Sequence, residues 1–184
     1  MKRFLFILLF CINLFGEERV VTLSPSINEI VFALGEGKNV VANTNFCDFP
    51  LESKSIKKIG GYNSISLEKI LEVNPSVVIG QDYDEKLNSN LKALGIKTFI
   101  YKTNTISSIK NTINDLGVFF KQEEKAKELN LNIENALASV DSIVKDQKIL
   151  IVISPQKSLS NQIYVTGNFL YFEDIIKASG NQNA

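Results

Sequence analysis

Short apolar segments alternate with helical segments along most of the chain, and this alternation constrains the fold more than any other feature of the sequence. The apolar segments lie at residues 19–23, 40–44, 77–79 and 97–101. Runs such as Val77-Val78-Ile79 have no polar position, which is typical of strands buried on both faces. Strands of this kind, separated by helices, predict a parallel sheet with helices on both sides. The predicted fold class is therefore α/β.

Capping residues indicate where the helices between these strands begin and end. Ser26 is followed three residues later by Glu29, which matches a capping box at a helix N-terminus. Ser66 is expected to cap a further helix, other helices are expected to begin at Asp84 and Thr105, and helix stops are expected at Gly35 and Gly95.

The first sixteen residues have the order of a secretory signal peptide. A basic start at Lys2-Arg3 precedes an apolar run at residues 4–15 and the small residue Gly16. A transmembrane helix needs about 20 apolar residues, and this run is shorter. We therefore expect export across the membrane, with a mature chain that begins near residue 17.

Cysteine usage agrees with a released protein. Cys11 follows the bulky Phe10, where lipidation signals carry a small residue, so a lipid anchor is not expected. Removal of residues 1–16 leaves Cys47 alone, and a single thiol cannot close an internal disulfide. We expect Cys47 to be a small packed residue.

The composition excludes several classes of function. The chain has no His, which excludes Ser-His and Cys-His nucleophile pairs, imidazole zinc sites and His-ligated haem. Its 20 basic and 20 acidic residues balance, so there is no basic surface typical of nucleic-acid binding. The segment Gly35-Glu36-Gly37-Lys38 follows a helix instead of a strand and is not a P-loop. We predict a binding protein without catalytic residues, bound cofactor or protein-held metal.

A second α/β unit begins after a long charged segment. Residues 122–146 carry one apolar stripe among many Lys and Glu residues, which predicts a single long helix. Strands are expected at residues 148–153 and 162–166, and a helix at 169–178. The predicted organisation is a signal peptide (1–16), an N-terminal lobe (17–120), a connecting helix (121–146) and a partial C-terminal lobe (147–184).

Five motifs resemble one known family. They are Arg19 to Glu29 (RVVTLSPSINE), Phe46 to Pro50 (FCDFP), Gly60-Gly61-Tyr62, Ser66 to Ile70 (SLEKI) and Asn74 to Ile79 (NPSVVI). In this order they are similar to the periplasmic substrate-binding proteins of ABC importers, in the class that takes iron chelates and vitamin B12. The resemblance implies two α/β lobes joined by one long helix, with the ligand held between them. It also implies a monomer that delivers a metal chelate to a membrane permease and its ATPase.

The resemblance assigns a docking role to Glu68, at the position where family members carry a glutamate that meets an arginine of the permease. A bidentate pair between these groups would fix the docking register. The alternative is that Glu68 only favours the helix N-terminus, two residues past Ser66. Both roles are compatible.

Six residues are predicted to bind the ligand. Tyr62 follows two glycines and falls where related proteins place a large aromatic residue on the cleft floor. Phe46, Asp48 and Phe49 follow a strand, at the usual ligand edge of an open α/β sheet. Ser24 and Pro25 precede a helix N-terminus that could face an anionic group. The alternatives are core packing for Tyr62 or one phenylalanine, and simple capping for Ser24.

Two departures from the family pattern affect the choice of ligand. Only 38 residues follow Asp146, so the second lobe is incomplete, and the sequence is either a fragment of a longer product or an interrupted gene. The mature chain has no His and one arginine, Arg19, which favours a neutral corrinoid over a ferric siderophore. Tyr62 or Tyr83 could still ligate iron. An inactive fragment and a free-standing flavodoxin-like binding domain remain alternatives.

Overall fold

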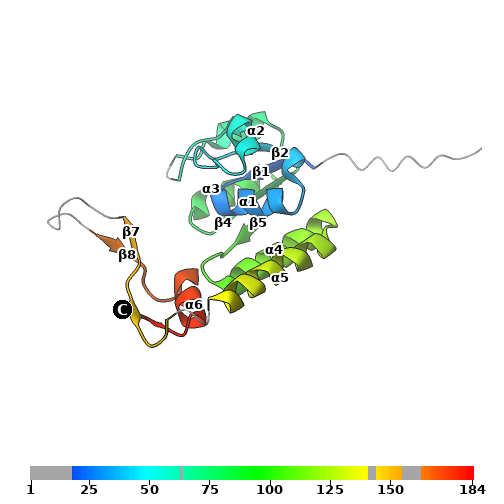
Figure 1. Ribbon diagram of the computed structural model, residues 1–184. Helices are drawn as coiled ribbons and strands as arrows, with labels where there is room; N and C mark the ends of the chain where they lie inside the picture. The colour runs from blue at the N-terminus through cyan, green and yellow to red at the C-terminus, as the bar shows by residue number, and fades with distance from the viewer. Residues whose placement is uncertain (1–17, 63, 141–143, 155–162) are drawn as a thin grey trace, which may run out of the picture.

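The computed structural model describes residues 18–62, 64–140, 144–154 and 163–184. Within these ranges the chain forms a five-stranded sheet with helices on both faces, followed by a smaller region of short strands and one helix (Figure 1). The predicted signal peptide at residues 1–16 lies outside the described residues. Of the helices in the described ranges, none is long and apolar enough to cross a membrane.

The five-stranded sheet is parallel throughout, with strand order β3-β2-β1-β4-β5. Its strands are β1 (Val20–Thr22), β2 (Val40–Asn43), β3 (Lys57–Lys58), β4 (Val77–Gln81) and β5 (Lys97–Tyr101). Val20 of the central strand β1 lies opposite Val40 on one side and Val77 on the other. The predicted α/β class is thus confirmed. The apolar pattern does not predict β3, because both of its residues are lysines.

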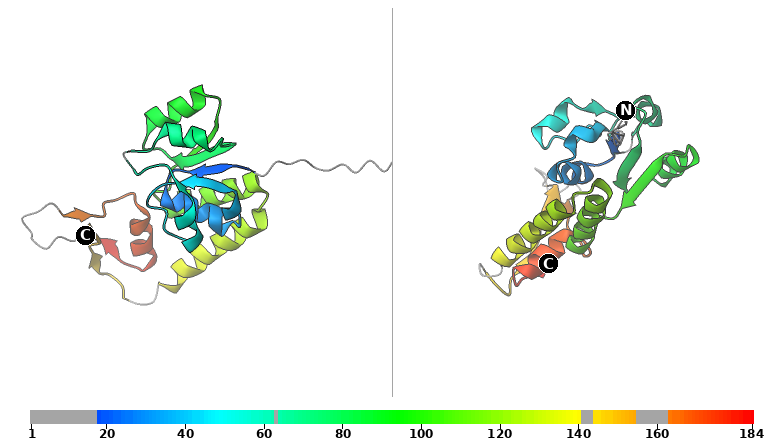
Figure 2. Two further views of the ribbon diagram at one scale, coloured as in Figure 1. Left: turned by 90° about the horizontal axis from the view of Figure 1, so that it is seen from above. Right: turned by 90° about the vertical axis from the view of Figure 1, so that its right-hand side faces the viewer.

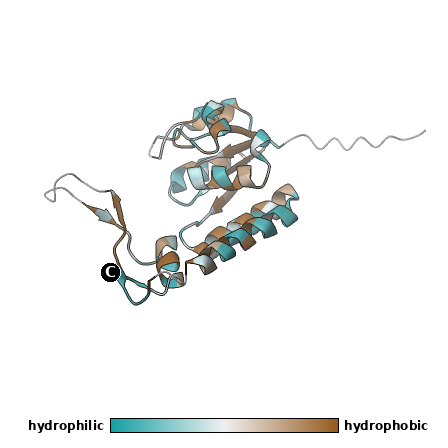
Figure 3. Cartoon of the chain, viewed as in Figure 1, coloured by the Kyte–Doolittle hydropathy of each residue, from teal (hydrophilic) through white to brown (hydrophobic). Residues whose placement is uncertain are grey.

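Neighbouring residues of β1 and β4 point to opposite faces of the sheet and build two cores. Val20, Val77 and Ile79 pack with α1 (Pro25–Ala33), α4 (Ile106–Phe120) and α5 (Glu123–Ser139). Val21 and Val78 pack with α2 (Leu67–Glu72) and α3 (Glu85–Ala93) on the other face. Figure 2 shows the two helical layers, and Figure 3 shows the hydrophobic strands between them. These five residues of β1 and β4 are fully buried, as expected for strands that helices cover on both faces of the sheet.

The helix caps follow the sequence pattern with one exception. Ser66, Asp84 and Thr105 accept hydrogen bonds from the backbone N–H groups three residues later, at the predicted helix starts. In α1, however, Ser24 is the N-cap and accepts from Ile27 N at 3.4 Å, so the predicted cap at Ser26 is wrong. Pro25 explains the difference, because its fixed φ and missing N–H suit the first helical position. Two 3-10 turns, η1 (Gly37–Asn39) and η2 (Leu51–Ser55), complete this part of the chain.

The connecting helix is shorter than the pattern at residues 122–146 predicts. α5 ends at Ser139, and its 17 residues span about 26 Å at 1.5 Å per residue. α4 and α5 form a hairpin, because Lys121 takes a left-handed conformation with φ 58°. The two helices cross closely at Gly117, where a Cβ atom would lie 2.5 Å from Ala126 Cβ.

The described residues of the C-terminal region form four short strands and α6 (Tyr171–Ala178). The strands are β6 (Lys148–Ile149), β7 (Val152–Ser154), β8 (Tyr164–Val165) and β9 (Gln182–Asn183). β6 pairs with β9 in parallel, whereas β7 pairs with β8 in antiparallel orientation. The single strand predicted at 148–153 is therefore two strands. Leu150 and Ile153 are more than half exposed, so this region lacks the double-sided cover of the first sheet.

Candidate functional site

The carboxyl edge of the parallel sheet gathers most of the residues predicted to bind a ligand, whereas Phe49 lies along α1, beside Ala33 and Gly37. Parallel strands end at the same edge, so the loops that follow them lie close together. Ser24 and Pro25 follow β1, the loop at residues 44–50 follows β2, and Tyr62 follows β3. The sheet thus brings together residues that are up to 38 positions apart, from Ser24 to Tyr62.

The aromatic side chains predicted to bind a ligand are exposed. Phe46 is 62% exposed, Phe49 67% and Tyr62 59%, so the alternative that one of them is a core residue is wrong. Phe46 lies over Gly61, where a Cβ atom would be only 3.0 Å from the ring. Gly60 has φ 117°, which favours glycine, and the turn after it presents Tyr62. The two glycines therefore have the local role that the sequence indicates.

Tyr83 belongs to the same cluster, although it is not among the six residues predicted to bind ligand. Its ring centroid lies 5.0 Å from that of Tyr62, with a tilt of 49°. Its hydroxyl donates to Gln81 Oε1. Burial raises the pKa of Tyr83, against the opposite effect of a hydrogen bond with Ser24, so the phenol stays neutral at pH 7. Its place directly after the apolar strand β4 is the signal that could have identified it.

The start of α1 is less open to an anion than the sequence suggests. Ser24 is 2% exposed, and its hydroxyl already accepts from Ile27 N. Pro25 has no N–H to offer. Two of the first three helical positions, Pro25 and Ile27, therefore offer no free donor, which favours the capping role for Ser24.

The two acidic residues predicted to have a role, Asp48 and Glu68, are both exposed, and they lie on different elements. Asp48 lies between the two exposed phenylalanines in the loop after β2. Glu68 lies in the first turn of α2, after the cap Ser66. Cys47, next to Asp48, is fully buried as expected, and its Sγ lies 3.2 Å from Thr44 Oγ1.

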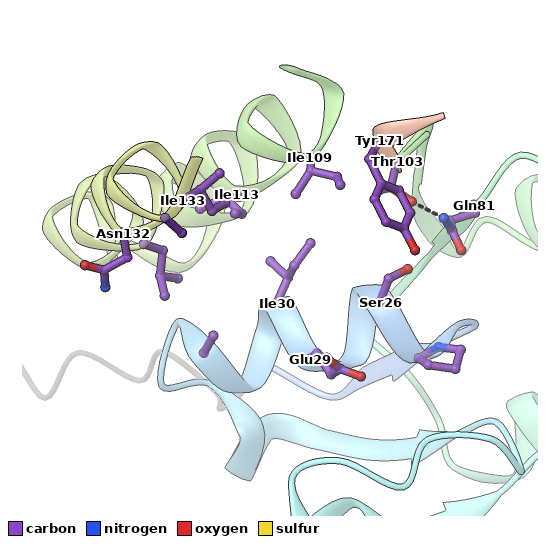
Figure 4. A pocket seen from close by; sticks show the side chains of 14 residues that line it. Ser26, Glu29, Ile30, Gln81, Thr103, Ile109, Ile113, Asn132, Ile133 and Tyr171 are labelled. Carbon is purple, nitrogen blue, oxygen red and sulfur yellow. Dashed lines mark hydrogen bonds between the residues drawn. The ribbon is translucent and has the colours of Figure 1, made fainter. Parts of the chain in front are cut away.

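A pocket that the sequence does not predict lies beside the aromatic cluster. It has a volume of about 770 Å³ and lies between α1, α4, α5 and α6 (Figure 4). Its inner wall is apolar and includes Ile30, Ile113 and Ile133. At its polar end Gln81 donates to Thr103. Pro25 lines this pocket, whereas the predicted aromatic residues do not.

The C-terminal region reaches this polar end of the pocket. Figure 4 shows the hydroxyl end of Tyr171, from α6, pointing toward Ser26. Asp174, one turn later, accepts a hydrogen bond from Ile106 N at 2.8 Å, at the start of α4. α6 is thereby attached to the first sheet's layer of helices. In the described ranges there is no group of three or more His, Cys, Asp or Glu residues that could hold a metal ion.

Comparison with known proteins identifies the family. Residues 20–184 match the model of the periplasmic binding protein family. The chain belongs to this family. The match includes the five motifs from Arg19 to Ile79 except Arg19 itself, and it confirms the resemblance that they indicate.

Two curated relatives illustrate the match. The vitamin B12-binding protein of Salmonella typhimurium is 30% identical over 132 residues, which are 70% of this chain and 48% of that protein. An uncharacterized ABC transporter substrate-binding lipoprotein of Bacillus subtilis is 26% identical over 178 residues, 91% of this chain and 55% of that protein. The chain spans about half the length of the curated relatives it matches.

Solved structures share the fold. The periplasmic heme-binding protein RhuT from Roseiflexus sp. RS-1 superposes with a TM-score of 0.77 at 24% identity, over 91% of this chain and 66% of that one. The periplasmic vitamin B12 binding protein BtuF of Vibrio cholerae gives a TM-score of 0.76 at 20% identity, over 90% and 65%. At these identities the likeness establishes the architecture.

Proposed function

We propose that this chain is an extracytoplasmic solute-binding component of an ABC importer that captures a metal chelate. The observation that carries the proposal is the group of exposed aromatic rings at the carboxyl edge of the sheet, Phe46, Tyr62 and Tyr83. Exposed rings in one place offer flat apolar faces to a flat ligand. Family membership supports the same function, since relatives carry names for vitamin B12 and heme binding.

In this proposal the first lobe comprises residues 17–120, the connecting segment 121–146 and the start of the second lobe 147–184. The aromatic edge is one wall of the cleft, and the second lobe supplies the other. Binding sites bury most of a ligand's surface, so one wall alone would bind weakly. The protein acts without catalysis and works as a monomer in the periplasm, free of a lipid anchor.

The ligand that best suits this wall is a corrinoid. A ferric siderophore that carries negative charge would favour arginine, which binds anionic oxygens in a bidentate manner. Arg19, the arginine of the described ranges, is engaged elsewhere. Its Nε donates to Val73 O at 3.1 Å, before the amino end of β4, away from the aromatic edge. A neutral, flat macrocycle needs no such clamp.

Delivery to the permease is assigned to Glu68. Its carboxylate is exposed on the first turn of α2, where a partner's arginine could reach it. Charged groups at the rim of an interface set register and association rate more than affinity. The partner ATPase would then drive release of the ligand.

Equilibrium dialysis of the full chain against cyanocobalamin, hemin and a ferric hydroxamate siderophore tests the ligand. Tyr62→Ala should weaken cyanocobalamin binding by about 1–2 kcal/mol, or roughly 5- to 30-fold. Leu94→Ala is the matched control, because Leu94 is 53% exposed but lies at the far end of α3. Tighter binding of the siderophore or hemin would replace the corrinoid, and equal effects of both variants would remove Tyr62 from the site.

A further inference from the structure

A buried network of polar side chains lies beneath the loop that presents Phe46 and Phe49. Its members come from three strands, α1 and η2, and most are completely buried. They are Thr22, Asn28, Asn43, Ser53 and Lys58. Buried polar groups that are fully paired fix one arrangement of the chain around them.

Asn28 is the centre of this network. Its Oδ1 accepts from Thr22 Oγ1 at 3.1 Å and from Asn43 Nδ2 at 3.2 Å. Its Nδ2 donates to Ser53 Oγ at 2.7 Å and to the backbone carbonyl of Phe49 at 3.2 Å. Both amide protons and both acceptor positions are therefore used. The amide connects α1 directly to the backbone of the aromatic loop.

Lys58 holds the same loop from the side of β3. Its Nζ donates to Asn43 Oδ1 at 2.8 Å, Ser53 O at 3.0 Å and Cys47 O at 3.1 Å. An ammonium group has three donors, and here all three meet neutral oxygens. Two of these acceptors, at positions 47 and 53, are backbone carbonyls on either side of Phe49.

In contrast to Lys58, the preceding lysine, Lys57, makes an exposed ion pair. Lys57 Nζ pairs with Glu72 Oε2 at 2.5 Å, and both side chains are about half exposed. Successive residues of a strand point to opposite faces, so only the second lysine of β3 can reach the loop. The two residues form a natural comparison, since they share residue type, strand and neighbours along the chain.

We propose that Lys58 and Asn28 are positioning residues, which hold the backbone of the loop at residues 44–50 so that the Phe46 ring is presented before the ligand arrives. The inference rests on the proposed function for its effect on binding. Its structural basis is that three contacts, to the carbonyls of Cys47, Phe49 and Ser53, reach the loop backbone itself. A loop that is already ordered loses less freedom on binding, which increases affinity.

The thiol of Cys47 gives a readout of loop order that needs no ligand. It is fully buried, and burial raises its pKa, so a disulfide reagent reacts only when the loop opens. In a Cys11→Ser background, Lys58→Met should increase the labelling rate about tenfold or more, since charge-assisted hydrogen bonds are lost. Lys57→Met should stay within about twofold of the parent, because an exposed ion pair contributes little. Equal rates for the two variants would overturn the proposal.

A binding measurement separates positioning from general stability. With cyanocobalamin as the probe, Lys58→Met should weaken affinity several-fold while Lys57→Met leaves it unchanged. If labelling accelerates but affinity is unchanged, the network orders the loop without serving the site, and the proposal is wrong. If no variant and no parent binds cyanocobalamin, nor hemin, the proposed function fails, and the labelling rates alone decide whether Lys58 orders the loop.

A milder variant covers the case in which Lys58→Met does not fold. Ser53→Ala removes the hydroxyl that accepts from Asn28 and donates to Phe49 O at 3.2 Å. We expect a labelling rate between those of the parent and Lys58→Met. Ser55→Ala is its control, because Ser55 Oγ donates to Glu52 O at 2.8 Å at an exposed position of the same turn. Faster labelling in Ser55→Ala than in Ser53→Ala would contradict the inference.

Discussion

Gly60→Ala should disrupt the turn that presents Tyr62 more than its small size suggests. A Cβ atom at this position would lie 2.1 Å from Ser64 O and 2.9 Å from Ser64 C. These are backbone atoms, so no side-chain rotation relieves the overlap. Residue 60 also has φ 117°, which an L-residue adopts only with strain. The strain costs about 1–2 kcal/mol, and overpacking adds about 1–3 kcal/mol.

The matched control is Gly95→Ala. Gly95 also has a positive φ of 72°, but a Cβ atom there would meet nothing within 4 Å. Both variants gain about 0.4–1 kcal/mol because alanine restricts the unfolded chain. We therefore expect a net loss of about 1–5 kcal/mol for Gly60→Ala and of about 0–1.5 kcal/mol for Gly95→Ala, and the contact with Ser64 accounts for the difference of about 1–3 kcal/mol.

Urea unfolding, followed by circular dichroism, measures the loss of stability in both variants. With a slope of about 2 kcal/mol per M, the midpoint should fall by about 0.5–2.5 M for Gly60→Ala and by less than about 0.8 M for Gly95→Ala. Equal midpoints for the two variants would refute the reasoning, because the contact with Ser64 would then have no energetic weight.

Three further predictions concern other parts of the molecule. Burial raises the pKa of Tyr101 to about 12, so the stability that its neutral phenol contributes is complete below the unfolded pKa near 10 and is lost as the pH rises toward 12. Tyr101→Phe should therefore remove the last step of the alkaline tyrosine titration followed at 295 nm. An unchanged titration would show that Tyr101 is not the group that ionises in this step. Gly117→Val should separate α4 from α5, because its Cβ would lie 2.5 Å from that of Ala126, and should lower the urea midpoint by about 1 M. Gly35→Ala meets nothing within 4 Å and has only the strain of its φ of 87°, so it should lower the midpoint by less. Glu68→Lys should keep chelate affinity and abolish uptake in a transport assay; loss of both would make Glu68 a structural residue.

Local patterns were sufficient to predict four of the five strands of the first sheet and most helix caps. Val77-Val78-Ile79 has no polar position, and a strand of this kind has few alternatives to a buried central place. Ser66, Asp84 and Thr105 cap helices because each has an acceptor side chain at the point where an apolar stripe begins. At α1 two serines compete, and Pro25 decides in favour of Ser24.

Features that depend on distant contacts were beyond this reasoning. The end of α5 at Ser139 is not marked by a glycine or proline, so an unbroken apolar stripe suggested a longer helix. The pocket between α1, α4, α5 and α6 requires knowledge of how four helices pack. The exposed state of Phe46 and Phe49 was also open, because a phenylalanine after a strand suits either a core or a ligand.

Hydrogen exchange across the whole chain, with and without cyanocobalamin, tests most directly whether the aromatic edge of the sheet binds the ligand. We expect slower exchange, on ligand addition, in the loop at residues 44–50, at residues 61, 62 and 64, and in the loop at residues 81–84. Protection confined to α1, α4 and α5 would instead place the ligand in the apolar pocket, and it would contradict the assignment of the aromatic edge as the binding wall.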